Sequence, residues 1–115
     1  MPRSLSRRVA APPKDSAPLF AALGDAARLR LVIRLCHDGP ASITRLTAGS
    51  KVTRQAVTKH LHVMEQAGLV HSERRGRESV WQLDRQRLDD ARRYLDLISQ
   101  QWDDALGRLR SFVED

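Results

Sequence analysis

The last quarter of the chain carries an uninterrupted apolar stripe, which limits how the chain can fold. Between residues 85 and 113, apolar side chains recur at alternating steps of three and four, the pattern of one long helix with a heptad seam. The seam consists of Leu88, Ala91, Leu95, Ile98, Trp102, Ala105, Leu109 and Phe112. Such a helix is about 43 Å long at 1.5 Å per residue. The rest of a 115-residue chain is too small to cover this stripe, so we expect a second copy to cover it.

A shorter segment in the middle of the chain divides into an apolar and a polar face. Read as a helix, residues 54–67 place Val57, Leu61 and Met64 on one side. The opposite side spans an arc of about 140° and consists of Arg54, Gln55, Thr58, Lys59 and His62. Side chains of these types donate hydrogen bonds to phosphates and base edges. A helix-turn-helix presents such a face to the major groove of DNA.

Capping residues outline the elements that precede this segment. Ser16 can begin a short helix at 17–23, and Asp25 can begin a second helix at 26–36. The first helix offers a second apolar surface for a partner copy, made of Leu19, Phe20 and Leu23. In the second helix we expect a core face made of Leu29, Val32, Ile33 and Cys36, widened by Leu31 and Leu35. Arg28 lies within that apolar arc, so we expect its guanidinium to reach the helix start or a carboxylate, with a phosphate contact as the alternative.

The sequence from 42 to 83 predicts a helix, a turn, a second helix and a β-hairpin. Ser42 caps a helix at 43–48, residues 49–52 form the turn, and Thr53 caps the polar-faced helix. Two strands at 69–74 and 78–83 flank a turn at 75–77. The hairpin tip carries Arg74, Arg75 and Arg77, which indicates a basic wing; the alternative is an ordinary charged hairpin.

The predicted fold class is therefore mainly α with a small β-hairpin: a winged helix-turn-helix with a long C-terminal dimerisation helix. We expect residues 1–16 to be a disordered basic tail and residues 17–115 to form the domain. Within it, residues 42–67 are the helix-turn-helix, 69–83 the wing, and 17–23 and 85–113 the dimerisation helices.

Charge is unevenly distributed along the chain. The formal net charge is +6 and the pI is about 10.7. Residues 42–83 carry a net charge of +4, whereas residues 84–115 carry −2. A strongly basic small domain favours a polyanionic partner, and nucleic acid is the usual one, although basic solubility without a partner is the alternative on charge alone. We expect the middle of the chain to face phosphates and its end to face protein.

These patterns assign a role to each candidate side chain. Arg54 and Gln55 open the polar-faced helix and are expected to contact base edges, while Thr58 and His62 contact bases or phosphates. We expect phosphate contacts from Ser42, Lys51, Thr53 and Lys59. Arg74, Arg75 and Arg77 would hold the DNA backbone or the minor groove.

Cysteine, histidine and apolar content argue against several other classes of protein. A single cysteine, Cys36, excludes an internal disulfide framework and suits a reducing cytoplasm. No apolar run approaches the roughly 18 residues of a membrane span. The start of the chain lacks the apolar run of a secretory signal, so a basic tail is favoured over a transit peptide.

His60 and His62 diverge by about 200° on a helix and cannot share an ion. We expect His60, on the apolar face, to be structural.

The combined motifs resemble the ArsR-type (ArsR/SmtB-like) winged helix-turn-helix regulators. Leu23-Gly24-Asp25 followed by Arg28-Leu29-Arg30-Leu31 resembles a stretch near the start of that family, and residues 53–61 resemble its DNA-reading helix. Residues 65–70 resemble the junction into the wing, and residues 75–78 the wing itself. The resemblance covers about 18–112. It implies a homodimer that binds an imperfect palindromic operator in double-stranded DNA, usually as a repressor and often of its own operon.

Two departures from that family matter. Asp25-Ala26-Ala27 lacks the family's Pro-Thr, which is a small change in capping chemistry. Metal-sensing members carry a Cys-x-Cys-type motif before the turn, or Asp, His and Glu ligands on the last helix. Residues 42–49 and 85–115 contain neither Cys nor His, and carboxylates alone make a poor transition-metal site. The chain therefore resembles the metal-independent branch, and we expect no metal or cofactor.

The sequence thus predicts a cytoplasmic, DNA-binding homodimeric repressor and leaves the operator and any inducer unnamed. One alternative is a ligand- or redox-responsive regulator that uses the same DNA surface. The expected place of Cys36 on a core face argues against the redox version. Another alternative is a winged helix that only binds protein. An enzyme is disfavoured, because the chain shows no nucleophile–base pair, phosphate-binding glycine loop or metal constellation.

Overall fold

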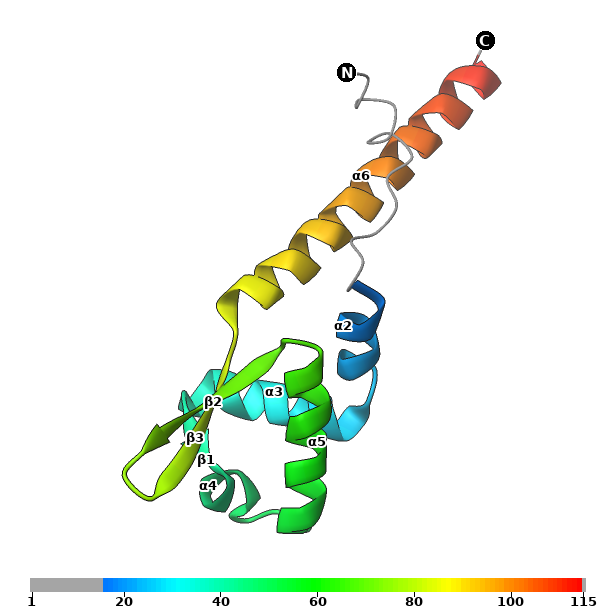
Figure 1. Cartoon of the computed structure of the whole chain (residues 1–115). Coiled ribbons are helices and arrows are strands. Elements are labelled where there is room, and N and C mark those ends of the chain that lie inside the picture. The colour runs from blue at the N-terminus through cyan, green and yellow to red at the C-terminus, as the bar shows by residue number, and fades with distance from the viewer. Residues whose placement is uncertain (1–15, 115) are drawn as a thin grey trace.

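The computed structural model describes residues 16–114 and has the predicted winged helix-turn-helix architecture (Figure 1). Its elements in chain order are α2 (Ser16–Leu23), α3 (Ala26–Asp38), β1 (Ala41–Ser42), α4 (Ile43–Thr47), α5 (Arg54–Gln66), β2 (Val70–Arg75), β3 (Glu78–Leu83) and α6 (Arg85–Glu114). The predicted basic tail lies outside the described residues, apart from Ser16, which is the first residue of α2. None of the described helices is both long enough and apolar enough to cross a membrane.

The sheet has one strand more than the sequence predicts. Its three strands lie in the order β1-β3-β2, and both pairs are antiparallel. The hairpin turns at Gly76, whose φ of 64° favours glycine. The extra strand pairs Ala41 with Trp81 and Ser42 with Val80. Because Ser42 also caps α4, this short strand ties the wing to the helix-turn-helix.

The core lies where α2, α3, α5 and the sheet meet. Val57, Leu61 and Met64 are each no more than 2% exposed, so the predicted apolar face of α5 is confirmed. Gly68, at φ 76°, follows that helix and turns the chain toward β2; Leu69 just before the strand and Val70 at its start are also buried. The buried apolar residues are Leu19, Ala22, Leu31, Leu35, Ala41, Leu46, Val57, Leu61, Met64, Leu69, Val70, Trp81 and Ala91.

The buried face of α3 differs from the prediction. Leu31 and Leu35, which widen the predicted face, are buried and Val32 packs against the core, whereas Leu29 and Ile33 are 44% and 64% exposed and Cys36 is exposed. Apolar side chains surround more than half of this helix, so periodicity alone does not show which side faces the core. The exposure of Cys36 also removes the burial argument against a redox role.

The Arg28 side chain holds the end of α2. Its Nε donates to the carbonyl oxygen of Ala22 at 2.8 Å, and its Nη2 donates to that of Ala21 at 3.3 Å. These carbonyls belong to the last turn of α2, where helix carbonyls lose their helical N–H partners; the Ala21 carbonyl also accepts from the Gly24 backbone N at 3.1 Å. Of the two expected placements, the side chain takes the one at the start of α3, and Asp25 accepts a hydrogen bond from the Arg28 backbone N at 3.0 Å.

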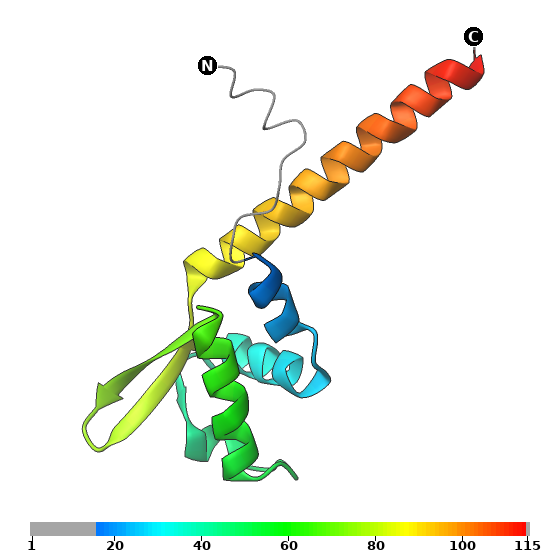
Figure 2. The same ribbon diagram turned by 45° about the vertical axis from the view of Figure 1, so that its right-hand side comes forward.

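The last helix, α6, extends beyond the body of the domain (Figure 2). Its first half packs against α2, where the rings of Phe20 and Tyr94 lie 5.9 Å apart between centroids. Farther along, Trp102 is 62% exposed and Phe112 is 81% exposed. The predicted single long helix is confirmed, and its second half is uncovered within the described chain.

Thr53 offers a direct test of the local structure around α5. Its side chain accepts a hydrogen bond from the backbone N of Ala56 at 3.1 Å, which satisfies one free donor at the start of the helix. We expect Thr53→Ala to lower the free energy of unfolding by about 1 kcal/mol. Thr53→Ser keeps the acceptor and should lie close to wild type in a urea titration; equal loss in both variants would contradict the capping role.

Candidate nucleic-acid interface

The helix-turn-helix consists of α4, the turn at 48–53 and α5, which we call the reading helix. Both helices begin as predicted: the Ser42 Oγ accepts from the Arg45 backbone N at 3.2 Å, and Thr53 caps α5. Each hydroxyl accepts a hydrogen bond in its cap and keeps its own hydrogen. Both groups can therefore still donate to a phosphate beside the positive end of a helix.

The polar face of the reading helix is turned away from the core. Arg54, Gln55, Lys59 and His62 are exposed and Thr58 is half-buried. These five residues lie opposite Val57, Leu61 and Met64, as the sequence predicts. The start of α5 and the hairpin both lie on the side of the molecule away from α6 (Figure 1). An extended basic surface is therefore available to a long polyanion.

Two side chains at the start of the reading helix are held in place by hydrogen bonds. The Arg54 Nη1 donates to the Thr44 Oγ1 of α4 at 2.9 Å, which orients the guanidinium across the two helices. The Thr58 Oγ1 donates to the Arg54 carbonyl oxygen at 2.8 Å. That bond uses the hydroxyl hydrogen, so toward DNA Thr58 offers an acceptor and a methyl group. Sequence reasoning did not single out Thr44, although it lies in the first turn of α4.

His62 lies between the reading helix and the wing. Its ring meets the Trp81 ring of β3 edge-on, with centroids 5.9 Å apart. Its Nδ1 lies 3.3 Å from the Glu65 Oε1. The prediction gave His62 a DNA contact only, whereas its geometry also joins two elements of the proposed contact surface.

The wing carries the exposed arginines that the sequence predicts. In the hairpin register, Arg74 lies opposite Ser79 and Arg75 opposite Glu78. The Arg75 Nη2 is 3.9 Å from the Glu73 Oε1, a loose surface ion pair that contributes little to stability. Arg77 follows the turn glycine and is exposed, as is Lys51 in the turn before α5.

Sequence comparisons agree with this geometry. A family described as a helix-turn-helix domain matches residues 23–73. The chain is 38% identical over 68 residues to the HTH-type transcriptional regulator YuzN of Bacillus subtilis, and the match covers 54% of this chain and 74% of the relative. It is 41% identical over 63 residues to the HTH-type transcriptional regulator Rv2034 of Mycobacterium tuberculosis, covering 55% and 58% of the two chains.

A solved structure extends the likeness to most of the chain. An ArsR-like transcriptional regulator from Rhodococcus sp. RHA1 superposes with a TM-score of 0.77 at 32% identity, covering 85% of this chain and 92% of that one. The chain belongs to the ArsR family of transcriptional regulators. The family and the fold are those of DNA-binding regulators rather than enzymes. Among residues 16–114 of this ArsR-family chain, no three His, Cys, Asp or Glu side chains gather as metal ligands would.

The side chains predicted to contact a partner copy fall into two groups. Leu19 and Ala91 are 1% and 8% exposed, so they pack within their own chain and are left out of the proposed interface. Phe20, Leu23, Leu88 and Ala105 are partly buried. The remaining predicted residues of α6 are exposed and free to meet a partner: Leu95, Ile98, Trp102, Leu109 and Phe112.

Proposed function

We propose that this protein is a homodimeric repressor that binds a palindromic operator through the reading helix and the wing. The observation that carries the proposal is the outward polar face of α5, with Arg54 oriented by Thr44. Repression would follow from occupying a promoter, which needs no chemistry from the protein. By analogy with the family resemblance, the regulated promoter would include its own.

The exposed stripe of α6 supports the homodimer. Side chains such as Ile98, Trp102 and Leu109 form an apolar surface on one face of α6. In a dimer, the stripe of one copy would cover the stripe of the other and bury both. A twofold dimer presents two reading helices to successive major grooves, about 34–36 Å apart. A palindromic site is the DNA counterpart of that symmetry.

Within each half-site, the contacts divide by chemistry. Arg54 and Gln55 contact base edges, with arginine favouring guanine and glutamine favouring adenine. Thr58 and His62 contact bases or phosphates one turn farther along α5. The phosphate contacts come from Ser42, Lys51, Thr53, Lys59 and the wing residues Arg74, Arg75 and Arg77.

Metal-independent regulation is also part of the proposal. It is supported by the absence of Cys and His from 42–49 and 85–115. The competing function is a winged helix that binds only protein. Against it stands the side-chain chemistry of the α5 face, since Arg54, Gln55 and Lys59 suit DNA groove contacts better than an apolar interface.

The direct test is fluorescence anisotropy of the full chain on DNA taken from immediately upstream of its own gene, against a shuffled duplex at two salt concentrations. A preference of roughly 10³ or more for the native duplex is expected of a specific autoregulator. Equal, steeply salt-dependent binding to both duplexes would contradict autoregulation at that site. No binding at low salt would favour the protein-interaction function.

The wing has its own test. Arg77→Ala should reduce the slope of log K against log salt by about 1 for each phosphate that the wing no longer neutralises, because a neutralised phosphate releases its counterions. Sequence preference should remain nearly unchanged, since binding to the DNA backbone carries no base information. Arg92→Ala removes the same charge from the exposed surface of α6 and is the matched control. An unchanged slope in Arg77→Ala would remove this residue from the proposed DNA-binding set.

A further inference from the structure

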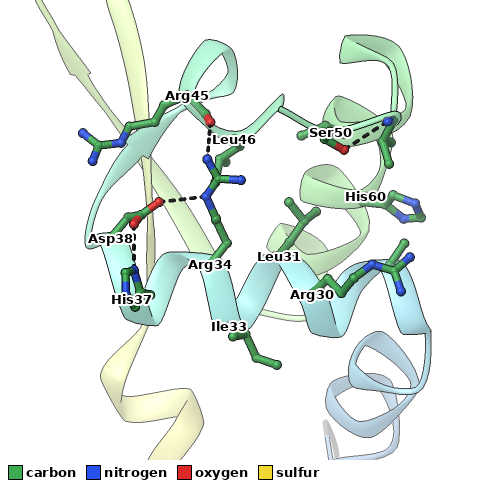
Figure 3. A pocket seen from close by; sticks show the side chains of 13 residues that line it. Arg30, Leu31, Ile33, Arg34, His37, Asp38, Arg45, Leu46, Ser50 and His60 are labelled. Atoms are coloured by element: carbon green, nitrogen blue, oxygen red, sulfur yellow. Dashed lines mark hydrogen bonds and ion pairs between the residues drawn. The ribbon is translucent and has the colours of Figure 1, made fainter. Parts of the chain in front are cut away.

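A cavity of about 700 Å³ lies between α3 and the helix-turn-helix (Figure 3). Volumes of roughly 300–1,000 Å³ are usual for small-molecule sites. The cavity is lined by α3, α4, the turn and the start of α5, on the side of the reading helix away from its polar face. Its apolar lining residues are Ala27, Leu31, Ile33, Leu46, Val52 and Val57.

One carboxylate lines this cavity, and it is already paired. The Asp38 Oδ2 lies 2.8 Å from the Arg34 Nε, and its Oδ1 lies 3.0 Å from the His37 Nδ1. The hydrogen bond with His37, and then that with Arg34, lower the pKa of Asp38 to about 2. Asp38 therefore stays ionised at neutral pH. The Arg34 Nη2 also donates to the Arg45 carbonyl oxygen at 3.0 Å, so this guanidinium is fixed between α3 and α4.

Two of the other basic groups at the cavity are free to bind a ligand. Within residues 16–114, the guanidinium of Arg30 and the ring of His60 make no hydrogen bond or ion pair, whereas the Arg45 guanidinium points away from the cavity (Figure 3). Arg30 and His60 lie together at one end of the cavity (Figure 3). The Asp25 carboxylate acts electrostatically on His60, but the backbone N of Arg28 already binds that carboxylate. The half-buried His60 ring therefore keeps both of its nitrogens available to a ligand, and its structural role stays a prediction.

We propose that this cavity binds a small organic anion with an apolar body, such as a medium-chain carboxylate. Arg30 and His60 would hold the charged head group, and the apolar body would lie on the half-buried Val52, over the largely buried Leu31 and Val57. Arg30 and Arg34 against the single carboxylate of Asp38 leave the lining positive, which favours an anion over a cation or a neutral molecule. The apolar lining selects against a bare inorganic anion.

Such a ligand would contact both α3 and α5, whose packing against each other positions the reading helix. Leu31 belongs to α3, whereas Val57 and His60 belong to α5, so filling the space between them changes how these helices pack. Binding of the anion would therefore alter affinity for DNA. This regulatory consequence rests on the proposed function, whereas anion binding does not.

The first experiment measures binding without DNA. Octanoate is titrated into the full-length protein by calorimetry, and 1-octanol serves as the neutral ligand with the same apolar chain. Saturable octanoate binding is expected, with 1-octanol weaker by about tenfold or more because it lacks the charge. Arg30→Glu should weaken octanoate binding by at least about tenfold. Arg92→Glu, an equal charge change on exposed α6, should leave it unchanged.

Backbone amide chemical shifts locate the site. Octanoate should shift signals from α3, the turn and the start of α5. Shifts confined to α6 would mean that the chain binds the exposed apolar stripe, and would overturn the proposal. So would a lack of saturable binding, equal affinity for 1-octanol, or an Arg30→Glu variant that binds as wild type does.

A second readout separates this proposal from the proposed function. Anisotropy on DNA is repeated with and without octanoate. A change in DNA affinity that Arg30→Glu abolishes supports the regulatory consequence. Octanoate binding without any DNA binding would contradict the proposed function and leave the anion site intact, whereas specific DNA binding without octanoate binding would overturn only the anion site.

Discussion

Trp102→Asp is expected to convert the protein from dimers to monomers. Trp102 lies in the middle of the exposed α6 stripe and is 62% exposed within its own chain, so the substitution disturbs few contacts inside the protomer. In the proposed dimer the new carboxylate would be buried without a partner, at a cost of several kcal/mol for each copy. We expect the dissociation constant of the dimer to rise by at least about a hundredfold. Sedimentation equilibrium measures this directly.

Gly107→Asp is the matched control for that experiment. It adds the same charge to the same helix, on the side away from the stripe, and a Cβ at this position meets no atom within 4 Å. This variant should stay dimeric. A Trp102→Asp protein that also stays dimeric at the wild-type dissociation constant would remove the α6 stripe from the interface. If both variants lost the dimer, the cause would be a general effect of added charge on α6, and not the specific loss of Trp102 from the interface.

Arg54→Ala is expected to weaken binding to the specific operator by roughly 1–3 kcal/mol per half-site and to relax the preference for one base. The guanidinium is held by the Thr44 Oγ1 at 2.9 Å, so little conformational freedom is lost when it meets a base edge. Because the proposed dimer uses two copies, the effect on the whole site should be about twice as large. Anisotropy on the operator and on single-base variants of it measures both quantities.

Arg54→Lys separates charge from geometry. Lysine keeps the positive charge but lacks the planar pair of donors that guanine accepts, so specificity should fall while non-specific binding persists. Thr44→Val removes the hydroxyl that orients Arg54 and should lower specific affinity by less than Arg54→Ala does. If Arg54→Ala weakened all sequences equally, Arg54 would contact phosphate alone.

The reading helix could be predicted because its two faces differ sharply in character. Val57, Leu61 and Met64 lie within one arc and the basic and amide side chains in another, so only one orientation buries the apolar set. Helix α3 has no such division. Leu29 and Ile33 are as apolar as Leu31 and Leu35, and only packing against α5 and the sheet determines which pair is buried.

The long-range contacts could not be predicted from the sequence either, because they too depend on how separate elements pack. Strand β1 is two residues long and has no pattern of its own; it exists because Ala41 and Ser42 meet Trp81 and Val80. The contact of Arg54 with Thr44 joins residues ten positions apart across a turn. The cavity depends on how α3 packs against the helix-turn-helix, and the periodicity of a single helix does not contain that information.

The uncovered second half of α6 has a consequence for how such a regulator responds to its own abundance. A single protomer leaves Trp102 and Phe112 exposed to water, whereas the proposed dimer is the species that would bind a twofold operator. Below the dissociation constant of the proposed dimer, the number of dimers grows with the square of the chain concentration. Promoter occupancy would then rise steeply over a narrow range of expression, and the helix that lies farthest from the DNA would set that threshold.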